Sequence, residues 1–185
     1  MSERKGPDLR HHLPMLAIIA VTAFAVPAAV ATFIGSGLYN IGADAPHTKP
    51  VFWLIGQLRD RSIAVRARGL TPPADLTDPG RVAAGAGLYD KLCVSCHLAP
   101  QMKKTDLARG LYPKAPPLAY GTDLTPGQEF WVIKHGVKLT AMPAWGRTHD
   151  DAEVWDLVAF IRKMPDLDAA GYKAAANAAP PAAAK

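Results

Sequence analysis

The stretch Lys91–Pro100, "KLCVSCHLAP", contains both cysteines of the 185-residue chain, Cys93 and Cys96, with His97 directly after the second. Two thiols three residues apart beside an imidazole are compatible with a redox dithiol, half of a zinc site, a small disulfide loop or covalent attachment of haem. These four possibilities imply different proteins. The residues on either side of the stretch distinguish them.

Around this stretch the sequence predicts a small, loop-rich, all-α domain at residues 77–168. Three helices are expected, each with a recognisable start: Asp78-Pro79, Thr125 with Gln128, and residues 148–151. Gly136 is expected to end the second helix and Pro165 the third. No alternating strand pattern is visible, and so small a domain has little apolar core of its own. A large buried cofactor would therefore help it to fold.

Three of the four possibilities fit this domain poorly. A thioredoxin-type dithiol belongs beside a βαβ pattern, and a zinc site needs four ligands, for which there is no second cysteine pair. A disulfide would leave His97 unexplained. Cys-x-x-Cys-His is the pattern for attachment of haem c. We therefore expect one haem, bound through Cys93 and Cys96, with His97 as an iron ligand.

The iron then needs a second axial ligand. The candidates are Met142, Met102, His135, His149 and Met164. Met142 is the expected ligand, because Pro143 stiffens a loop without helical periodicity. Met102 follows the attachment stretch too closely to reach the opposite face. Met164 ends the last helix, and His135 lies at a helix C-terminus, where the helix dipole stabilises an imidazolium.

These residues resemble a class I cytochrome c of the bacterial membrane-anchored single-haem kind. The resemblance is carried, in chain order, by "AAGAGLYDKLC", the Cys-x-x-Cys-His motif, "PKAPPLAYG", "FWVIKHG", the Met142-Pro143 pair and "EVWDLVAFIRKMP". It covers residues 80–165, about half of the chain.

The resemblance implies a haem pocket in which the first and last helices cross at right angles. Gly85 or Gly87 and Tyr89 would meet Trp155 and Phe160 at that crossing. Pro116 or Pro117 would offer a backbone carbonyl to the second ring nitrogen of His97. Trp145 is a further expected cofactor-binding residue.

The N-terminal segment, residues 1–48, contains a candidate membrane span at about residues 13–38. No Asp, Glu, Lys or Arg occurs between His11 and Ala43, which suits a helix of about 20 residues across a bilayer. A signal peptide cleaved after Ala31 is the alternative. A retained anchor is preferred because the apolar run continues past that site. Both interpretations export the rest of the chain, so a bacterial inner-membrane protein with a periplasmic haem domain is expected.

Residues 49–76 are expected to form an amphipathic helix followed by a linker. Val51, Leu54, Ile55, Leu58, Ser62 and Val65 share one face of that helix, and four arginines lie mostly off it. The helix could lie on the bilayer or a partner subunit, or pack on its own domain. Residues 169–185, rich in Ala and Pro, are expected to be disordered.

With both axial positions filled by protein, no substrate reaches the iron, so an electron carrier is expected rather than an enzyme. It would move single electrons between a respiratory or dehydrogenase complex and an oxidase or another acceptor. The alternatives are an integral haem subunit of a multi-subunit membrane oxidoreductase, and a sensor or peroxidatic protein with a displaceable Met142. Partners are expected to be membrane redox proteins and the bilayer, with no nucleic acid. Between Gln101 and Arg147 there are seven Lys and Arg residues and three acidic residues. This excess of positive charge would steer an acidic partner toward the segment.

Overall fold

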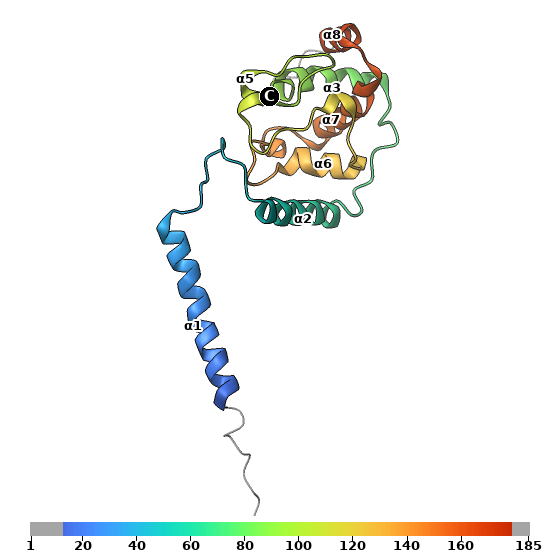
Figure 1. Ribbon diagram of the computed structural model, residues 1–185. Coiled ribbons are helices and arrows are strands. Elements are labelled where there is room, and N and C mark those ends of the chain that lie inside the picture. Colours follow the sequence, from blue (N-terminus) through green and yellow to red (C-terminus); the bar gives the residue numbers. More distant parts are fainter. Residues whose placement is uncertain (1–12, 179–185) are drawn as a thin grey trace, which may run out of the picture. The chain divides into compact units, whose positions relative to one another are not determined.

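The computed structural model describes residues 13–178, and every regular element in this part of the chain is a helix. The chain divides into two compact units, Met1–Ala45 and Pro46–Lys185, which are described separately (Figure 1). The all-α fold expected from the sequence is confirmed.

The first unit contains α1, Leu13–Ser36, which holds Pro27 without ending there. By length and composition this helix is able to cross a membrane, with a mean hydropathy of 2.3 in its most apolar window. A signal sequence near an N-terminus meets the same criterion. The basic residues 1–12 that precede it lie outside the described part of the chain.

The second unit is a helical domain with long irregular connections between its helices. Its elements are α2 (Lys49–Arg66), α3 (Pro79–Leu92), α4 (Val94–His97), α5 (Asp106–Gly110), η2 (Leu118–Tyr120), α6 (Pro126–His135), η3 (Trp145–Arg147), α7 (Asp151–Lys163), η4 (Met164–Asp166) and α8 (Ala169–Asn177). The expected helix starts are present. Asp78 caps α3 through the backbone N–H groups of Gly80 and Arg81, and complete capping boxes begin α6 and α7.

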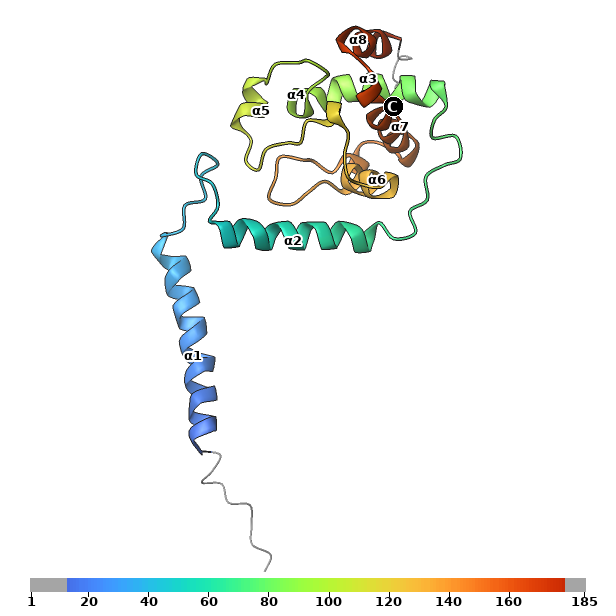
Figure 2. The same ribbon diagram turned by 45° about the vertical axis from the view of Figure 1, so that its right-hand side comes forward.

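The centre of the domain is the crossing of α3 with α7 (Figure 2). A Cβ on Gly85 would lie 1.9 Å from the carbonyl oxygen of Asp156 and 2.9 Å from the Cβ of Phe160. The absence of a side chain therefore allows the two backbones to touch. Tyr89, fully buried, packs on Phe160 at a ring-centroid distance of 5.5 Å. The resemblance did not decide which of Gly85 and Gly87 lies at the crossing. The structure shows that Gly85 makes the close approach.

Trp155 does not join Tyr89 as expected. Its ring instead stacks on Phe130 of α6, with centroids 4.3 Å apart and planes 21° apart. Trp155 and Phe160 are five residues apart on α7, so they lie on different sides of the helix. Phe160 therefore faces α3, whereas Trp155 faces α6.

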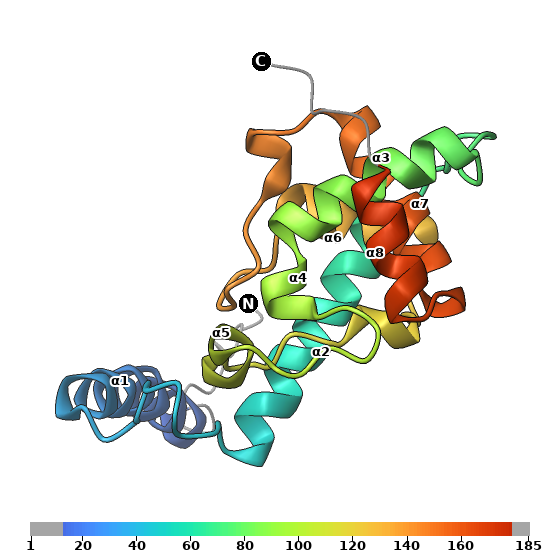
Figure 3. The same ribbon diagram turned by 90° about the horizontal axis from the view of Figure 1, so that it is seen from above.

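The expectation of a disordered tail is wrong for residues 169–177, which form α8 beside α3 and α7 (Figure 3). Asp168 caps α8 through the N–H of Gly171. Tyr172 is only 5% exposed, packs near Tyr89 and Phe160, and donates its hydroxyl hydrogen to Asp90 at 2.9 Å. One aromatic side chain thus attaches an otherwise Ala-rich segment to the core. The rest of the expected disorder, at residues 179–185, lies outside the described residues.

Helix α2 packs on α6 mainly through a side that the sequence does not suggest, and the expected apolar face is only partly covered, with Val51 and Ile55 half-buried. Its buried residue is Ile63, 5% exposed, followed by Ala67 at 9% just after the helix. Leu58 on the expected face is 70% exposed. The helix therefore has two apolar sides: the domain covers the side of Ile63, and it leaves Leu54, Leu58 and Val65 exposed on the other.

Candidate haem-attachment site

The motif residues lie on one helical turn that directly continues α3. Cys93 ends α3 and begins α4, and its carbonyl accepts the N–H of Cys96 at 3.1 Å and of His97 at 2.9 Å. Residues three and four apart on such a turn share a side. Cys93, Cys96 and His97 are therefore presented together, as attachment of one flat macrocycle requires.

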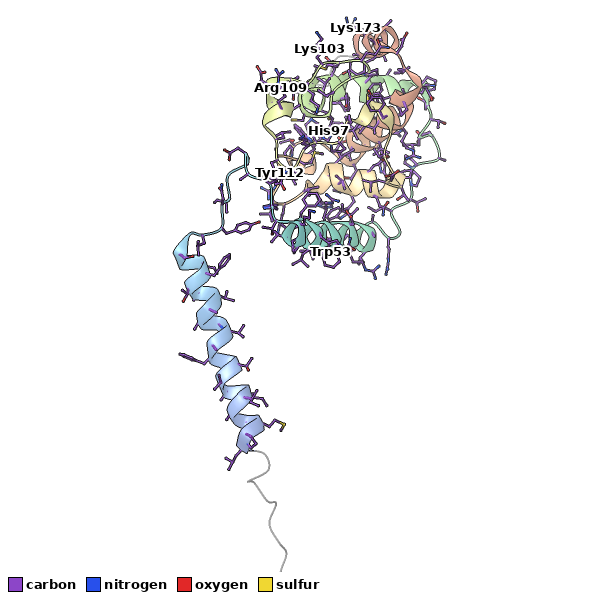
Figure 4. The ribbon with its side chains drawn as sticks, in the orientation of Figure 1. Trp53, His97, Lys103, Arg109, Tyr112 and Lys173 are labelled. Carbon is purple, nitrogen blue, oxygen red and sulfur yellow. The ribbon has the colours of Figure 1, made fainter. Side chains whose placement is uncertain are left out.

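The ring of His97 is oriented by a hydrogen bond from its Nδ1 to the carbonyl oxygen of Pro116, over 2.9 Å. A carbonyl only accepts, so Nδ1 carries the hydrogen and Nε2 retains the lone pair that a metal needs. Burial lowers the pKa of His97, against the opposing effect of the Pro116 hydrogen bond. Figure 4 shows His97 within the domain. The ring of His97 is thus held in one direction, with Nε2 unprotonated.

Pro116, not Pro117, supplies that carbonyl. The carbonyl of Pro117 instead accepts the N–H of Tyr120 at 3.4 Å, at the start of η2. Both prolines belong to the loop that precedes the buried Leu118. Pro117 therefore contributes to the shape of this loop, and Pro116 makes the contact with His97.

The two thiols fit covalent attachment of haem better than a disulfide, a redox dithiol or a zinc site. They are not joined in a disulfide. Burial, with a smaller contribution from Cys96, raises the pKa of Cys93 to about 12, whereas a redox dithiol depends on a lowered thiol pKa. Within residues 13–178, no group of three or more His, Cys, Asp or Glu side chains is placed to hold a metal ion. A zinc site is therefore unsupported there.

The loop that carries Met142 is held against the end of α6. The carbonyl of Met142 accepts the N–H of Val137 at 3.2 Å, and its own N–H donates to the hydroxyl of Thr140 at 3.0 Å. Gly136 ends α6 with a φ of +66°, and a Cβ there would lie 2.7 Å from the Met142 carbonyl oxygen. Thr140 was not anticipated from the sequence. The local signal for this hydrogen bond is a Thr two residues before Met142, because a Thr hydroxyl often accepts the backbone N–H two residues later.

The other axial candidates have different surroundings. Met164 is fully buried in the core, whereas Met102 is 40% exposed. His135 is exposed and packs beside Trp131, with ring centroids 5.0 Å apart. His149 lies edge-on to Trp145 and is hydrogen-bonded to Thr148.

Met142 and Trp145 are partly buried and pack against the core cluster that includes Cys93 and Leu118. The structure thus brings three segments to one hydrophobic cluster: the loop of Met142, the loop of Pro116 and Pro117, and the cysteine motif. These residues fit haem c: two thiols on one helical turn, a neutral imidazole with its Nε2 free, and a thioether in a restrained loop. The fold and this residue set define the domain as a c-type cytochrome.

Comparison with known proteins agrees with this class of domain. Residues 80–161, the cytochrome c domain, match the family described as cytochrome C oxidase, cbb3-type, subunit III. A cbb3-type cytochrome c oxidase subunit CcoP from Azospirillum sp. (strain B510) is 27% identical over 133 residues, covering 70% of this chain. The chain spans only 41% of the length of that relative. No solved structure matches the chain.

Proposed function

We propose that this chain is a membrane-anchored cytochrome c with one haem, carrying one electron at a time between a respiratory or dehydrogenase complex and an oxidase or another acceptor. The observation that carries this proposal is the His97–Pro116 hydrogen bond, which leaves Nε2 of His97 available to iron. The cytochrome c domain of the cbb3 subunit III family supports it.

In this proposal Cys93 and Cys96 would hold the haem covalently, and His97 and Met142 would ligate its iron. Haem c, when bound, supplies reversible one-electron exchange between Fe(II) and Fe(III). Pro116 keeps the imidazole of His97 in one tautomer, and Thr140 holds the backbone of Met142. Trp145, partly buried against the core cluster, would help to shield the haem from water. Because His97 and Met142 together would leave no iron position open, these residues would serve electron transfer rather than a reaction of a bound substrate.

The axial assignment is tested by Met142→Ala. We expect the haem to stay covalently attached, the reduced protein to bind carbon monoxide, and the midpoint potential to fall, because a thioether favours Fe(II). Met102→Ala and His135→Ala are matched controls in exposed positions and should leave both properties unchanged. If the unmodified reduced protein binds carbon monoxide, the carrier proposal is wrong and a ligand-binding haem protein takes its place.

A second candidate is a fixed haem subunit of a multi-subunit membrane oxidoreductase. Its support is the similarity to the CcoP relative, whose name makes it a subunit of an oxidase. Extraction in mild detergent with a C-terminal tag separates the two candidates. A stoichiometric complex that survives in detergent would favour the fixed subunit, and a chain recovered alone would favour the tethered carrier.

The anchor part of the proposal places α1 in the bacterial inner membrane and the haem domain in the periplasm. The uncharged, apolar helix of residues 13–36 supports it. We expect the protein to resist extraction by alkaline carbonate and its mature N-terminus to lie before α1. A mature chain beginning at Thr32, measured by mass spectrometry, would make it a soluble periplasmic carrier instead.

The basic segment between Gln101 and Arg147 is proposed to meet an acidic redox partner. Lys103, Lys104, Lys114 and Lys138 are exposed. Lys103 and Arg109 lie at the outer edge of the domain in Figure 4. Opposite charge accelerates encounter, and salt screens it. We therefore expect the rate of electron transfer to the partner to fall as ionic strength rises, and a rate independent of salt would contradict this docking mode.

A further inference from the structure

Helix α2 presents a strip of apolar side chains that its own domain leaves uncovered. Leu54 is 61% exposed, Leu58 70% and Val65 41%. With 3.6 residues per turn, residues spaced by four and by seven fall on one side of a helix. The buried Ile63 lies on a different side, where α2 packs on α6. We call Leu54, Leu58 and Val65 the outer strip.

Arginines lie on both sides of the outer strip, at different separations. At about 100° per residue, Arg61 falls about 20° from Leu54, whereas Arg66 and Arg59 fall about 80° and 100° beyond Leu58 on the other side. Arg59 pairs with Asp60 at 2.7 Å, and Arg66 donates to the hydroxyl of Ser62 at 2.9 Å. Among the described residues, the structure records no ion pair for Arg61 or Arg66. An apolar strip bordered by cations matches the boundary between acyl chains and anionic headgroups.

The connection to α1 restricts where α2 is able to go. Residues 37–48 separate the two helices, and fully extended they span at most about 40 Å. Within the second unit, the backbone N–H of His47 donates to the hydroxyl of Tyr112 at 2.8 Å, and the two rings pack edge to face. The chain is therefore attached to the domain just before α2 begins. With α1 in a bilayer, α2 is among the parts of the domain held closest to it along the chain.

We propose that α2 binds the surface of an anionic bilayer, with the outer strip against the acyl boundary and the arginines at the lipid phosphates. A protein partner with an apolar groove is the competing occupant. The bilayer is favoured because the arginines border the strip on both sides and because the short connection brings lipid within reach. The second argument depends on the proposed anchor, whereas the outer strip and its arginines do not.

The test uses the full-length holoprotein in vesicles of phosphatidylcholine with or without phosphatidylglycerol. A protease site is inserted between Ile41 and Gly42, in the segment that connects α1 to α2. After cleavage, the haem absorbance that sediments with the vesicles measures binding by the second unit alone. We expect retention on anionic vesicles and release from pure phosphatidylcholine. Release from both would overturn the proposal and leave a protein partner as the occupant of the strip.

Matched variants separate binding through the outer strip from non-specific hydrophobic binding. Leu58→Gln should weaken binding to anionic vesicles about tenfold, whereas Leu107→Gln, at a leucine of α5 that is 52% exposed, should leave it unchanged. Arg61→Gln should weaken it about fivefold, on anionic vesicles only. Equal binding by the two leucine variants would contradict the proposal. If the uncut protein does not stay in membranes, the proposed anchor is wrong. Binding of that soluble chain to the same anionic vesicles would then be measured to test α2 independently of the anchor.

Discussion

Replacing Gly85 with Ala should strongly destabilise the domain, because the added methyl group has no space. Its Cβ would lie 1.9 Å from the Asp156 carbonyl oxygen, whereas an ordinary contact begins near 3.4 Å. Helix α7 would have to move away from α3 by about 1.5 Å, the difference between these distances. The clash is with backbone, so no rotamer change relieves it. We expect a loss of about 3 kcal/mol or more in the free energy of unfolding, at the upper end for overpacked cores.

The assay is guanidinium unfolding of the holoprotein, followed by circular dichroism at 222 nm. Gly56→Ala is the matched control, since Gly56 lies within α2 and a Cβ there would meet nothing within 4 Å. That variant should be unchanged or more stable by up to about 1 kcal/mol, because Ala favours a helix. A Gly85→Ala protein within about 1 kcal/mol of the unmodified protein would refute the close crossing of α3 and α7.

Three further predictions concern substitutions of buried or haem-attachment side chains. Burial raises the pKa of Glu129 above 4.5, so just above pH 4.5 the folded state binds more protons than the unfolded state. The free energy of unfolding should therefore fall as the pH rises through the folded pKa. Glu129→Gln should reduce this fall, measured by comparing unfolding at pH 4.5 and pH 7. Tyr89→Phe removes a buried 2.7 Å hydrogen bond to the Leu98 carbonyl and should cost about 1–2 kcal/mol, with unchanged stability as the contrary result. Changing both Cys93 and Cys96 to Ala should leave any haem extractable by acidified organic solvent, and haem retained after extraction would contradict attachment at these residues.

Local signals allowed the helix starts to be predicted from the sequence. Asp78, Thr125 and Asp150 each accept backbone N–H groups at the beginning of the expected helices. Capping depends on residues within one turn, so a short window of sequence contains the whole interaction. The Cys-x-x-Cys-His motif is local in the same sense. The class of domain and the position of the motif were therefore predictable.

Long-range packing was not predictable in the same way. Trp155 was expected beside Tyr89 but stacks on Phe130, because the direction of a side chain across α7 depends on how three helices meet. The segment after Asp168 was expected to be disordered from its Ala content, whereas its order depends on Tyr172 reaching Asp90, 82 positions away. Composition does not record such a contact.

The candidate site shows the same division. The sequence narrowed the partner of His97 to two adjacent prolines, and the backbone path of the loop decides that the carbonyl of Pro116 points at the ring. It pointed to Met142 but not to Thr140, because a single threonine in a loop has many possible partners. The choice of packing side on α2 was missed because both sides of that helix carry apolar residues.

The crossing of α3 and α7 also limits when Cys93 is accessible during folding. Cys93 is 7% exposed and belongs to the core cluster that both helices build. Residues 79–97 precede residues 151–163 in the chain, so the thiol is accessible until the later helix packs on it. In the proposed haem protein, the macrocycle would have to join Cys93 during that interval. Slower arrival of α7 would lengthen the time available for the modification, and premature closure would produce a folded chain that never receives it.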